Sequence, residues 1–459
     1  MKIEENHYIW VDGAASGDTS HREGSNTTAA GDYSHAEGLH SVSHGSTSHA
    51  EGYLSVAYGH YSHSEGYETV AKGESAHAEG SKTMASGKAS HAEGYQAMAT
   101  GRTSHAEGMN TNATQQASHA EGEETSATGN WSHAEGYYTE AKGDSAHAEG
   151  YYTYANQSYS HAEGYNTEAN GESSHAEGEY TIATGRGSHA EGYLTNGWSD
   201  KKTINEAKLI INGQAVGDYS HREGINTSAI GTWSHAENVH TIAVGNGSHA
   251  EGNISVAYGD FSHAEGNESY SAGYAAHAEG GKAPIQDPAN NNTSTGPVSH
   301  ASSAYTTAHG TNSHAEGSGT WTKGEAAHAE GKLTKAEGEY SHAEGRSTSA
   351  LGKGSHSEGY YTSAIGEATH AEGYSTKAGK IDEGMGTILG EYSHAEGYYT
   401  EASAQAAHAE GHYTEASGKY SHAEGVYTNA KLDGAHAEGG WTKAEQGYSH
   451  AEGYHTRAY

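Results

Sequence analysis

A five-residue motif, Ser-His-Ala-Glu-Gly or a close variant of it, recurs along almost the whole chain of 459 residues. Its histidine returns every 14 residues from His21 to His189, from His221 to His277, from His300 to His370 and from His394 to His450. These four series hold 29 copies of the motif and 29 of the 37 histidines. A repeat of fixed length indicates a solenoid, in which each repeat forms one coil and stacks on the next.

Each 14-residue unit has two halves that follow the same pattern, a small residue, any residue, Ala, any residue and Gly, as in residues 132–136 and 139–143. Alternation with a period of two, closed by glycine, predicts a short strand that ends in a turn. A helix is disfavoured because a glycine every seven residues would cost about 1 kcal/mol each relative to alanine. The sequence therefore predicts an all-β fold, a parallel β-solenoid with two short strands per coil and about 4.8 Å between coils.

The period of two also predicts which side chains enter the coil. Ser132 and Ala134 share one face of a strand, while His133 and Glu135 share the other. We expect the small residues to face inward, because Ser, Thr and Ala recur in both halves. Such a thin interior buries mostly methyl groups, worth about 0.8 kcal/mol each. We therefore expect neighbouring chains to supply the missing burial.

The two half-repeats resemble the head repeat of the trimeric autotransporter adhesins. The resemblance implies a left-handed parallel β-roll and a homotrimeric rod, with three chains packed around one axis. In that family the outward residues of one strand are commonly apolar, whereas this chain has His and Glu there. The pentapeptide itself is also similar to repeats of phage and prophage tail-fibre proteins.

The first half-repeat varies little, and its glutamate is present in 28 of the 29 copies, Ser302 being the exception. We interpret this uniform face as the side towards a threefold axis, with His and Glu hydrogen-bonded between chains or between successive layers. On this hypothesis the pKa values of the histidines are raised and those of the glutamates lowered, so that trimer stability peaks in mildly acidic to neutral solution. The members singled out for this axial ladder at the trimer interface are His35, Glu37, His49, Glu51, His77, Glu79, His91, Glu93, His133, Glu135, His147 and Glu149.

The same residues limit the chemistry of the repeat. A Ser-His-Glu triad cannot form, because adjacent Ser and His side chains point to opposite faces of a strand. The chain has no cysteine, which excludes thiolate metal sites and cysteine nucleophiles. We expect no enzyme, no catalytic residue and no cofactor. The alternative for the cofactor is an occasional metal or anion on the threefold axis, because His-x-Glu on one strand face can bind a metal.

Charge and hydropathy exclude two classes of partner. The formal net charge of −35 lacks the basic footprint of a nucleic-acid binder. No run of 18 apolar residues is present, so we predict no membrane insertion. The first residues also lack the apolar stretch of a signal peptide.

Three insertions interrupt the array. We expect the non-repeat N-terminal segment to anchor the chain to a virion or a tail baseplate. The predicted organisation is an anchor segment 1–16, a first β-roll array 17–196, an insertion 197–216, a second array 217–280, a proline-containing insertion 281–298, and a continued array 299–459 with a loop insertion near 377–390.

Insertions in solenoids usually leave as surface loops, which are candidates for receptor contact. The first insertion offers Trp198, Lys201 and Lys202 for such contact. Tyrosines also gather at the predicted corners of the coils, as at Tyr137 and Tyr138. These rings either stack from coil to coil and cover the turns or, in exposed rows, bind sugars.

The alanine of the motif becomes arginine in two copies, at Arg22 and Arg222. Because arginine does not fit a thin interior lined by alanine, we predict that these two coils are caps, where an open end of the roll meets water. With caps at these two coils, the chain would form two separate rolls stacked on each other. The alternative is one continuous rod with a local bulge.

Together these features predict a structural and receptor-binding fibre of a phage or phage-tail-like particle, released by lysis of the host. The expected partners are two further copies of the chain and a bacterial surface receptor such as a glycan. The alternative is a bacterial trimeric surface adhesin or matrix fibre. The second alternative, a polysaccharide-degrading tail spike, would need paired carboxylates about 5–10 Å apart in a cleft.

Overall fold

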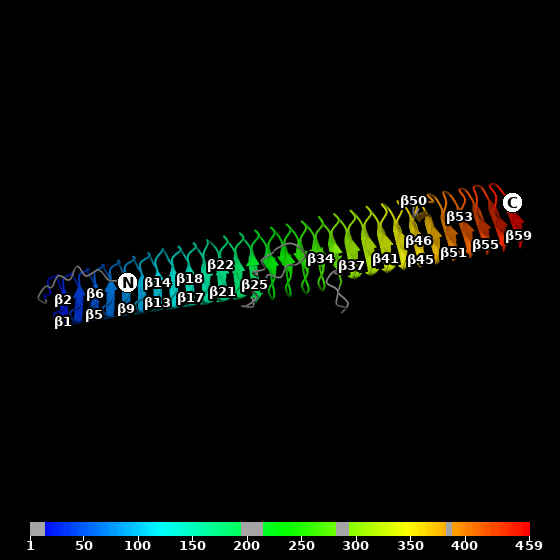
Figure 1. Ribbon diagram of the computed structural model, residues 1–459. Coiled ribbons are helices and arrows are strands. Elements are labelled where there is room, and N and C mark those ends of the chain that lie inside the picture. Colours follow the sequence, from blue (N-terminus) through cyan, green and yellow to red (C-terminus); the bar gives the residue numbers. More distant parts are fainter. Residues whose placement is uncertain (1–13, 194–213, 281–292, 382–387) are drawn as a thin grey trace. The chain divides into compact units, whose positions relative to one another are not determined.

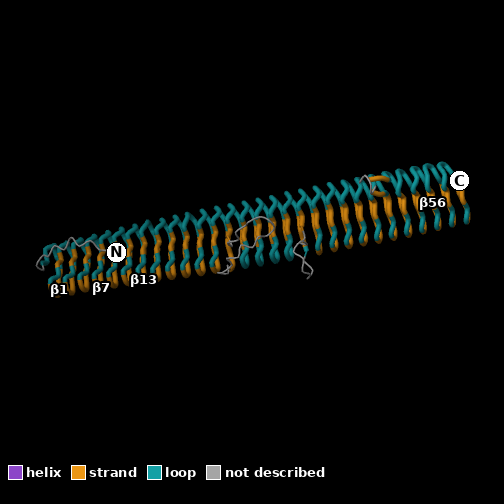
Figure 2. The backbone as a smooth tube through the Cα atoms, in the orientation of Figure 1, coloured by secondary structure: helices purple, strands orange, loops and turns teal. Residues whose placement is uncertain are grey.

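The computed structural model describes residues 14–193, 214–280, 293–381 and 388–459. The chain divides into two compact units, with the boundary between Asn226 and Thr227. Each unit is a stack of coils built from strands and turns (Figures 1 and 2). Within the described ranges there is no helix long and apolar enough to cross a membrane.

Each coil of the first unit contributes one strand that starts at the motif histidine and one two-residue strand from the second half-repeat. The histidine strands are β1 (His21–Ser25), β3 (His35–Leu39), β5 (His49–Tyr53), β7 (His63–Tyr67), β9 (His77–Ser81), β11 (His91–Tyr95), β13 (His105–Met109), β15 (His119–Glu123), β17 (His133–Tyr137), β19 (His147–Tyr151), β21 (His161–Tyr165), β23 (His175–Glu179), β25 (His189–Tyr193) and β27 (His221–Arg222). The two-residue strands are β2 (Thr28–Ala29), β4 (Val42–Ser43), β6 (Val56–Ala57), β8 (Val70–Ala71), β10 (Met84–Ala85), β12 (Met98–Ala99), β14 (Asn112–Ala113), β16 (Ser126–Ala127), β18 (Glu140–Ala141), β20 (Tyr154–Ala155), β22 (Glu168–Ala169), β24 (Ile182–Ala183) and β26 (Gln214–Ala215).

The second unit repeats this plan and adds one antiparallel pair. Its histidine strands are β29 (His235–Ala236), β31 (His249–Ala250), β33 (His263–Ala264), β35 (His277–Glu279), β37 (His300–Ala304), β39 (His314–Ser318), β41 (His328–Lys332), β43 (His342–Arg346), β45 (His356–Tyr360), β47 (His370–Tyr374), β51 (His394–Tyr398), β53 (His408–His412), β55 (His422–Val426), β57 (His436–Gly440) and β59 (His450–Tyr454). Its other strands are β28 (Ser228–Ala229), β30 (Ile242–Ala243), β32 (Val256–Ala257), β34 (Tyr270–Ser271), β36 (Thr293–Ser294), β38 (Thr307–Ala308), β40 (Trp321–Thr322), β42 (Lys335–Ala336), β44 (Ser349–Ala350), β46 (Ser363–Ala364), β48 (Lys377–Ala378), β52 (Glu401–Ala402), β54 (Glu415–Ala416), β56 (Asn429–Ala430) and β58 (Lys443–Ala444), β60 (Arg457–Ala458), and the antiparallel pair β49 (Lys380–Ile381) and β50 (Ile388–Leu389).

Neighbouring coils pair in parallel with a register of one repeat. In β17 and β19, His133 lies beside His147 and Glu135 beside Glu149. The strands β18 and β20 pair in the same register. The predicted all-β parallel β-solenoid, with a 14-residue repeat and two strands per coil, is therefore confirmed.

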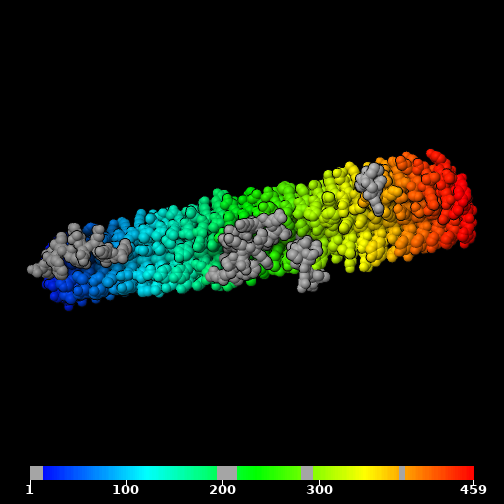
Figure 3. Space-filling model, in the orientation of Figure 1, coloured from blue at the N-terminus to red at the C-terminus, as the bar shows by residue number. Residues whose placement is uncertain are grey.

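The interior contains the small residues, as the alternation predicts. Except in the last coil, the alanines of both half-repeats have no exposed surface, as at Ala134 and Ala141, and Ser132 and Thr139 are also buried. The motif serine closes the preceding turn, because Ser132 Oγ donates a hydrogen bond to the Gly129 carbonyl at 2.7 Å. On the face shown in Figure 3, the visible side chains of the described residues lie closely packed from coil to coil within each unit.

The motif glycine allows successive coils to approach closely. Gly150 has a φ of +119°, and a Cβ atom there would lie 2.2 Å from the Gly164 carbonyl oxygen of the next coil. Both conditions exclude an ordinary side chain. The glycine that ends the motif is thus required by the spacing between coils.

The two arginines in place of the motif alanine differ from each other. Arg22 is exposed in β1, and its Nη1 donates to the Thr27 carbonyl at 3.1 Å. Arg222 is completely buried in β27, which pairs with β25, and its Nη2 donates to the Gly224 carbonyl at 3.2 Å. The predicted cap at Arg222, with its side chain in water, is wrong. The guanidinium fits inside because it finds a backbone carbonyl there, and burial lowers its pKa to about 10.

We predict that Gly150→Ala destabilises its coil by about 1–3 kcal/mol or more, since the new Cβ would clash with the Gly164 carbonyl. Thermal unfolding followed by circular dichroism measures the change. The matched control is Gly354→Ala, because a Cβ at Gly354 meets nothing within 4 Å and the equivalent Ala326 and Ala368 have the same backbone conformation. Equal melting temperatures for the two variants would contradict this account of the motif glycine.

Candidate functional site: the histidine-glutamate face

The motif histidines and glutamates lie on the outer face of the long strands, opposite the buried alanines. From β3 to β25 the histidine side chains are 34–38% exposed and the glutamate side chains 41–46% exposed. In this single chain the face is therefore half-buried and repeats almost unchanged from coil to coil.

The imidazole rings form a stacked column along each unit. His91, His105 and His119 follow one another with 4.7 Å between ring centroids and interplanar angles of 5° and 3°. The same arrangement continues through His249 and His263 in the second unit, at 4.8 Å and 3°. This column follows directly from the register, because the spacing of parallel strands is also the spacing of the rings.

Each histidine lies beside the glutamate of its own strand. For the residues predicted to form the ladder, the Nε2 to Oε2 distances are 3.9 Å for His35–Glu37, 3.8 Å for His49–Glu51, 3.5 Å for His77–Glu79, 3.8 Å for His91–Glu93, 3.9 Å for His133–Glu135 and 3.8 Å for His147–Glu149. Most of these distances exceed a hydrogen bond. The pairs are close enough for charge interaction, and the ladder at a trimer interface stays a prediction.

The rise in histidine pKa values expected for the trimer stays a prediction, and in the single chain the shifts run the other way. The pKa of His133 is lowered, first because the ring is partly buried and second because His147 stacks beside it. A proton on one ring repels a proton on the next, and the neighbouring glutamates offset this only in part. Other motif histidines whose pKa is lowered, with burial as the largest cause, are His63, His91, His119, His161, His175, His189, His249, His277, His314 and His328.

The glutamates do not share one direction either. A hydrogen bond with Glu237 lowers the pKa of Glu251, whereas burial raises the pKa of Glu265. The shift at Glu251 has the expected direction, but its largest cause is another carboxyl group and not a histidine. Carboxyl groups of successive coils therefore approach one another in this part of the second unit.

Sequence reasoning missed that the coils from His235 to His300 differ from the others. Their glutamate side chains are only 29–35% exposed, and β29, β31 and β33 contain two residues each. The sequence did contain a signal. Asn253 and Asn267 occupy the position after the motif glycine, where many other coils have tyrosine. The Asn253 side chain donates to Asn267 Oδ1 at 2.8 Å, so these asparagines form a column of their own.

Tyrosines form two further columns at the corner after the motif glycine. Tyr137 stacks on Tyr151 at 4.8 Å, and Tyr138 stacks on Tyr152 at 5.0 Å. Tyr137 and Tyr138 meet edge to face at 4.6 Å, and Tyr138 is 38% exposed. The rings thus cover the turns and also remain accessible along their edges.

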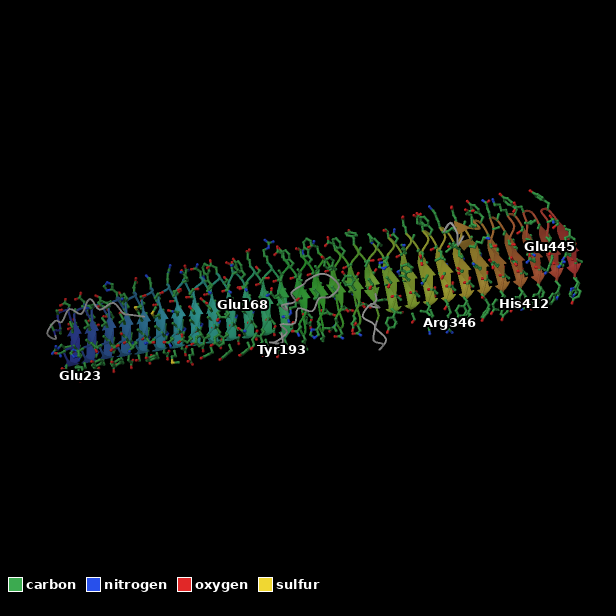
Figure 4. All side chains as sticks on the ribbon, viewed as in Figure 1. Glu23, Glu168, Tyr193, Arg346, His412 and Glu445 are labelled. Carbon is green, nitrogen blue, oxygen red and sulfur yellow. The ribbon has the colours of Figure 1, made fainter. Side chains whose placement is uncertain are left out.

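The second unit carries comparable rings at the same strand end. Tyr398 stacks on His412 at 5.0 Å. Figure 4 labels His412 and Arg346, whose side chains lie at the outer edge of these coils. The other predicted contact residues, Trp198, Lys201 and Lys202, lie outside the described residues.

Comparison with known families found a similarity for parts of the chain. A family model described as the YadA head domain repeat matches residues 162–188, 223–248, 236–262 and 343–367. These segments are therefore similar to head repeats of the kind found in trimeric autotransporter adhesins. No curated protein resembles the chain closely enough to count as a match.

The lowered histidine pKa values predict acid sensitivity. Below about pH 6.5 the histidines of the unfolded chain take up protons while the folded, stacked histidines resist protonation. The unfolded state then binds more protons, so the free energy of unfolding falls as the pH falls. We expect the melting temperature, measured by calorimetry, to drop between about pH 7.5 and about pH 5.5 and to change little above that range.

Salt provides the control for this prediction. High salt screens repulsion between protonated rings, so the drop in melting temperature should become smaller. A melting temperature that rises towards pH 5.5 would instead restore the original expectation of raised histidine pKa values.

Proposed function

We propose that this chain is the coiled body of a trimeric, adhesin-like fibre that acts outside the cell and attaches to a surface without catalysing a reaction. The observation that carries the proposal is the match of four segments to adhesin head repeats, on coils that share one register. Head repeats of that family serve as structural and binding elements.

The histidine-glutamate face is the best candidate for the trimer interface. It is the most uniform face of the coil, and in the single chain the Nε2 atoms of His133 and His147 are buried without a hydrogen bond. A neutral imidazole can donate one hydrogen bond to a carboxylate. Around a threefold axis, each layer would bring three imidazoles and three carboxylates together, which pairs both groups and buries the face.

The opposite outer face is suited to contact with a receptor. At the outward position of the second half-repeat, successive coils carry Glu140, Tyr154, Glu168 and Ile182, so this face varies from coil to coil. The edges of the tyrosine columns add hydroxyl groups and apolar ring surface. Such a mixture suits a glycan or a protein on a cell surface.

The family match favours the bacterial surface adhesin or matrix fibre over the phage or tail-fibre assignment, because the matched repeats are those of adhesin heads. Attachment to a virion, and an extracellular location after lysis, stay predictions.

We predict a trimer of the 47.9 kDa chain in native mass spectrometry at micromolar concentration. Glu135→Arg with Glu149→Arg places three new positive charges in each of two axial layers and should weaken trimerisation at least about tenfold. The matched control, Glu140→Arg with Glu168→Arg, changes the same number of charges on the opposite outer face and should leave the trimer intact. A monomeric wild-type protein, or equal weakening of the trimer by both variants, would contradict the proposal that the histidine-glutamate face lies at a threefold axis.

Attachment can be tested separately. We expect the purified protein to bind intact bacterial cells or a glycan array, and Tyr137→Ser with Tyr151→Ser to reduce the binding several-fold, because two stacked rings are lost. Glu179→Ser is the control, since Glu179 occupies the same strand-end position as Tyr137 but has no ring. A glutamate variant that binds as poorly as the tyrosine variant would rule out the tyrosine column as the contact.

A further inference from the structure

The coils from His235 to His300 place imidazole and carboxylate groups close enough to share an ion. In each case a histidine, the glutamate two residues later and the histidine of the next coil have ligand atoms within 4.8 Å of one another. The four overlapping triplets are His235–Glu237–His249, His249–Glu251–His263, His263–Glu265–His277 and His277–Glu279–His300. In the described part of the first unit, one such triplet is present, His119–Glu121–His133.

Glu279 shows the arrangement most clearly, because its two carboxylate oxygens face different coils. Oε2 lies 3.8 Å from Nε2 of His277, and Oε1 lies 3.5 Å from Nε2 of His300. The coil of His300 is the one whose motif glutamate is replaced, by the buried Ser302. Glu279 therefore bridges two successive coils.

The local backbone explains why the triplets gather here. In β29, β31 and β33 the regular strand ends before the glutamate, whereas it continues through the glutamate and the glycine in β3 to β25. The glutamate side chains of Glu237, Glu251 and Glu265 are correspondingly less exposed than those of the first unit. The carboxylates are thus more buried here, with ligand atoms of two successive histidines within 4.8 Å.

We propose that this segment binds divalent transition-metal ions of the zinc and cobalt class, each held by two imidazoles from successive coils and the carboxylate between them. Two nitrogens and one oxygen form a ligand set that suits these ions, whereas calcium and magnesium require mainly oxygen. Ligand atoms on a tetrahedral zinc ion lie about 3.4 Å apart, given bonds of about 2.0–2.1 Å. The two oxygens of Glu279 lie 3.8 Å and 3.5 Å from their histidines, and the three ligand atoms of each triplet lie within 4.8 Å, so an ion would draw them closer together.

The overlap of the triplets limits the number of ions. Neighbouring triplets share a histidine, so no more than two of the four can be filled at once if each imidazole serves one ion. The separate triplet at His119 adds one more site. The proposal therefore requires that each chain binds a small whole number of metal ions tightly. Weak binding spread over the whole histidine column would be a different behaviour.

The test is a titration of the full-length, chelator-treated protein with Co²⁺, followed by the visible absorption of tetrahedrally coordinated Co²⁺ and checked by competition with Zn²⁺. We expect one to three tight ions per chain, displaced by Zn²⁺ and not by Ca²⁺. Glu265→Gln with Glu279→Gln leaves two triplets that share His249, so the segment should lose one ion. The additional changes Glu237→Gln and Glu251→Gln should remove its remaining ion.

The matched control replaces four glutamates outside the triplets, Glu37, Glu51, Glu79 and Glu93, by glutamine. This control should keep every tight ion, and circular dichroism should show both quadruple variants folded. The triplets lie on the face proposed for the trimer interface, but the bound metal is counted per chain, so failure to bind it would leave the proposed adhesin function standing. Absence of saturable binding, a stoichiometry near the number of histidines, or an equal loss in the control variant would overturn the proposal.

Discussion

The parallel register of one repeat is the constraint on which the rest of the structure depends. Because each coil pairs with its neighbour 14 residues away, every side chain lies beside its own counterpart, as His133 does beside His147. The spacing of about 4.8 Å between parallel strands then applies to every column of side chains. Glycine at the motif end, alanine inside and rings that can stack outside are the residues that tolerate this repetition.

The same constraint penalises charge, since a column of like side chains is a column of like charges. Histidine suits the outer face because its ring can remain neutral. Burial of the ring first, and the neighbouring His147 second, lower the pKa of His133. Lysine side chains at this spacing could not lose their protons so readily, because the ordinary pKa of lysine is far higher. The glutamates, present in all motif copies except that of Ser302, keep the face negative and account for much of the formal charge of −35.

Departures from the regular coil mark the places with individual chemistry. Arg222 enters the interior by donating to the carbonyl of Gly224, and Glu279 faces histidines of two coils where Ser302 replaces the next glutamate. In both cases one residue of the repeat is replaced. The carbonyl of Gly224 then accepts a hydrogen bond from Arg222, and His300 lies beside the glutamate of the preceding coil. In a regular solenoid, such local exceptions are the natural candidates for specific binding.

The sequence alone determined the coil: its period of 14, its two strands, and the inward positions of Ser132 and Ala134, because strand alternation and repeat length need no tertiary information. Only the tertiary structure decided the electrostatics. Histidine and glutamate in the same strand suggested paired opposite charges. In the single chain, partial burial of the ring and, second, the imidazole of His147 stacked beside it lower the pKa of His133. The tertiary structure also placed Arg222 inside and brought Glu279 to His300. The second contact joins two repeats, and both depend on local backbone geometry that composition does not encode.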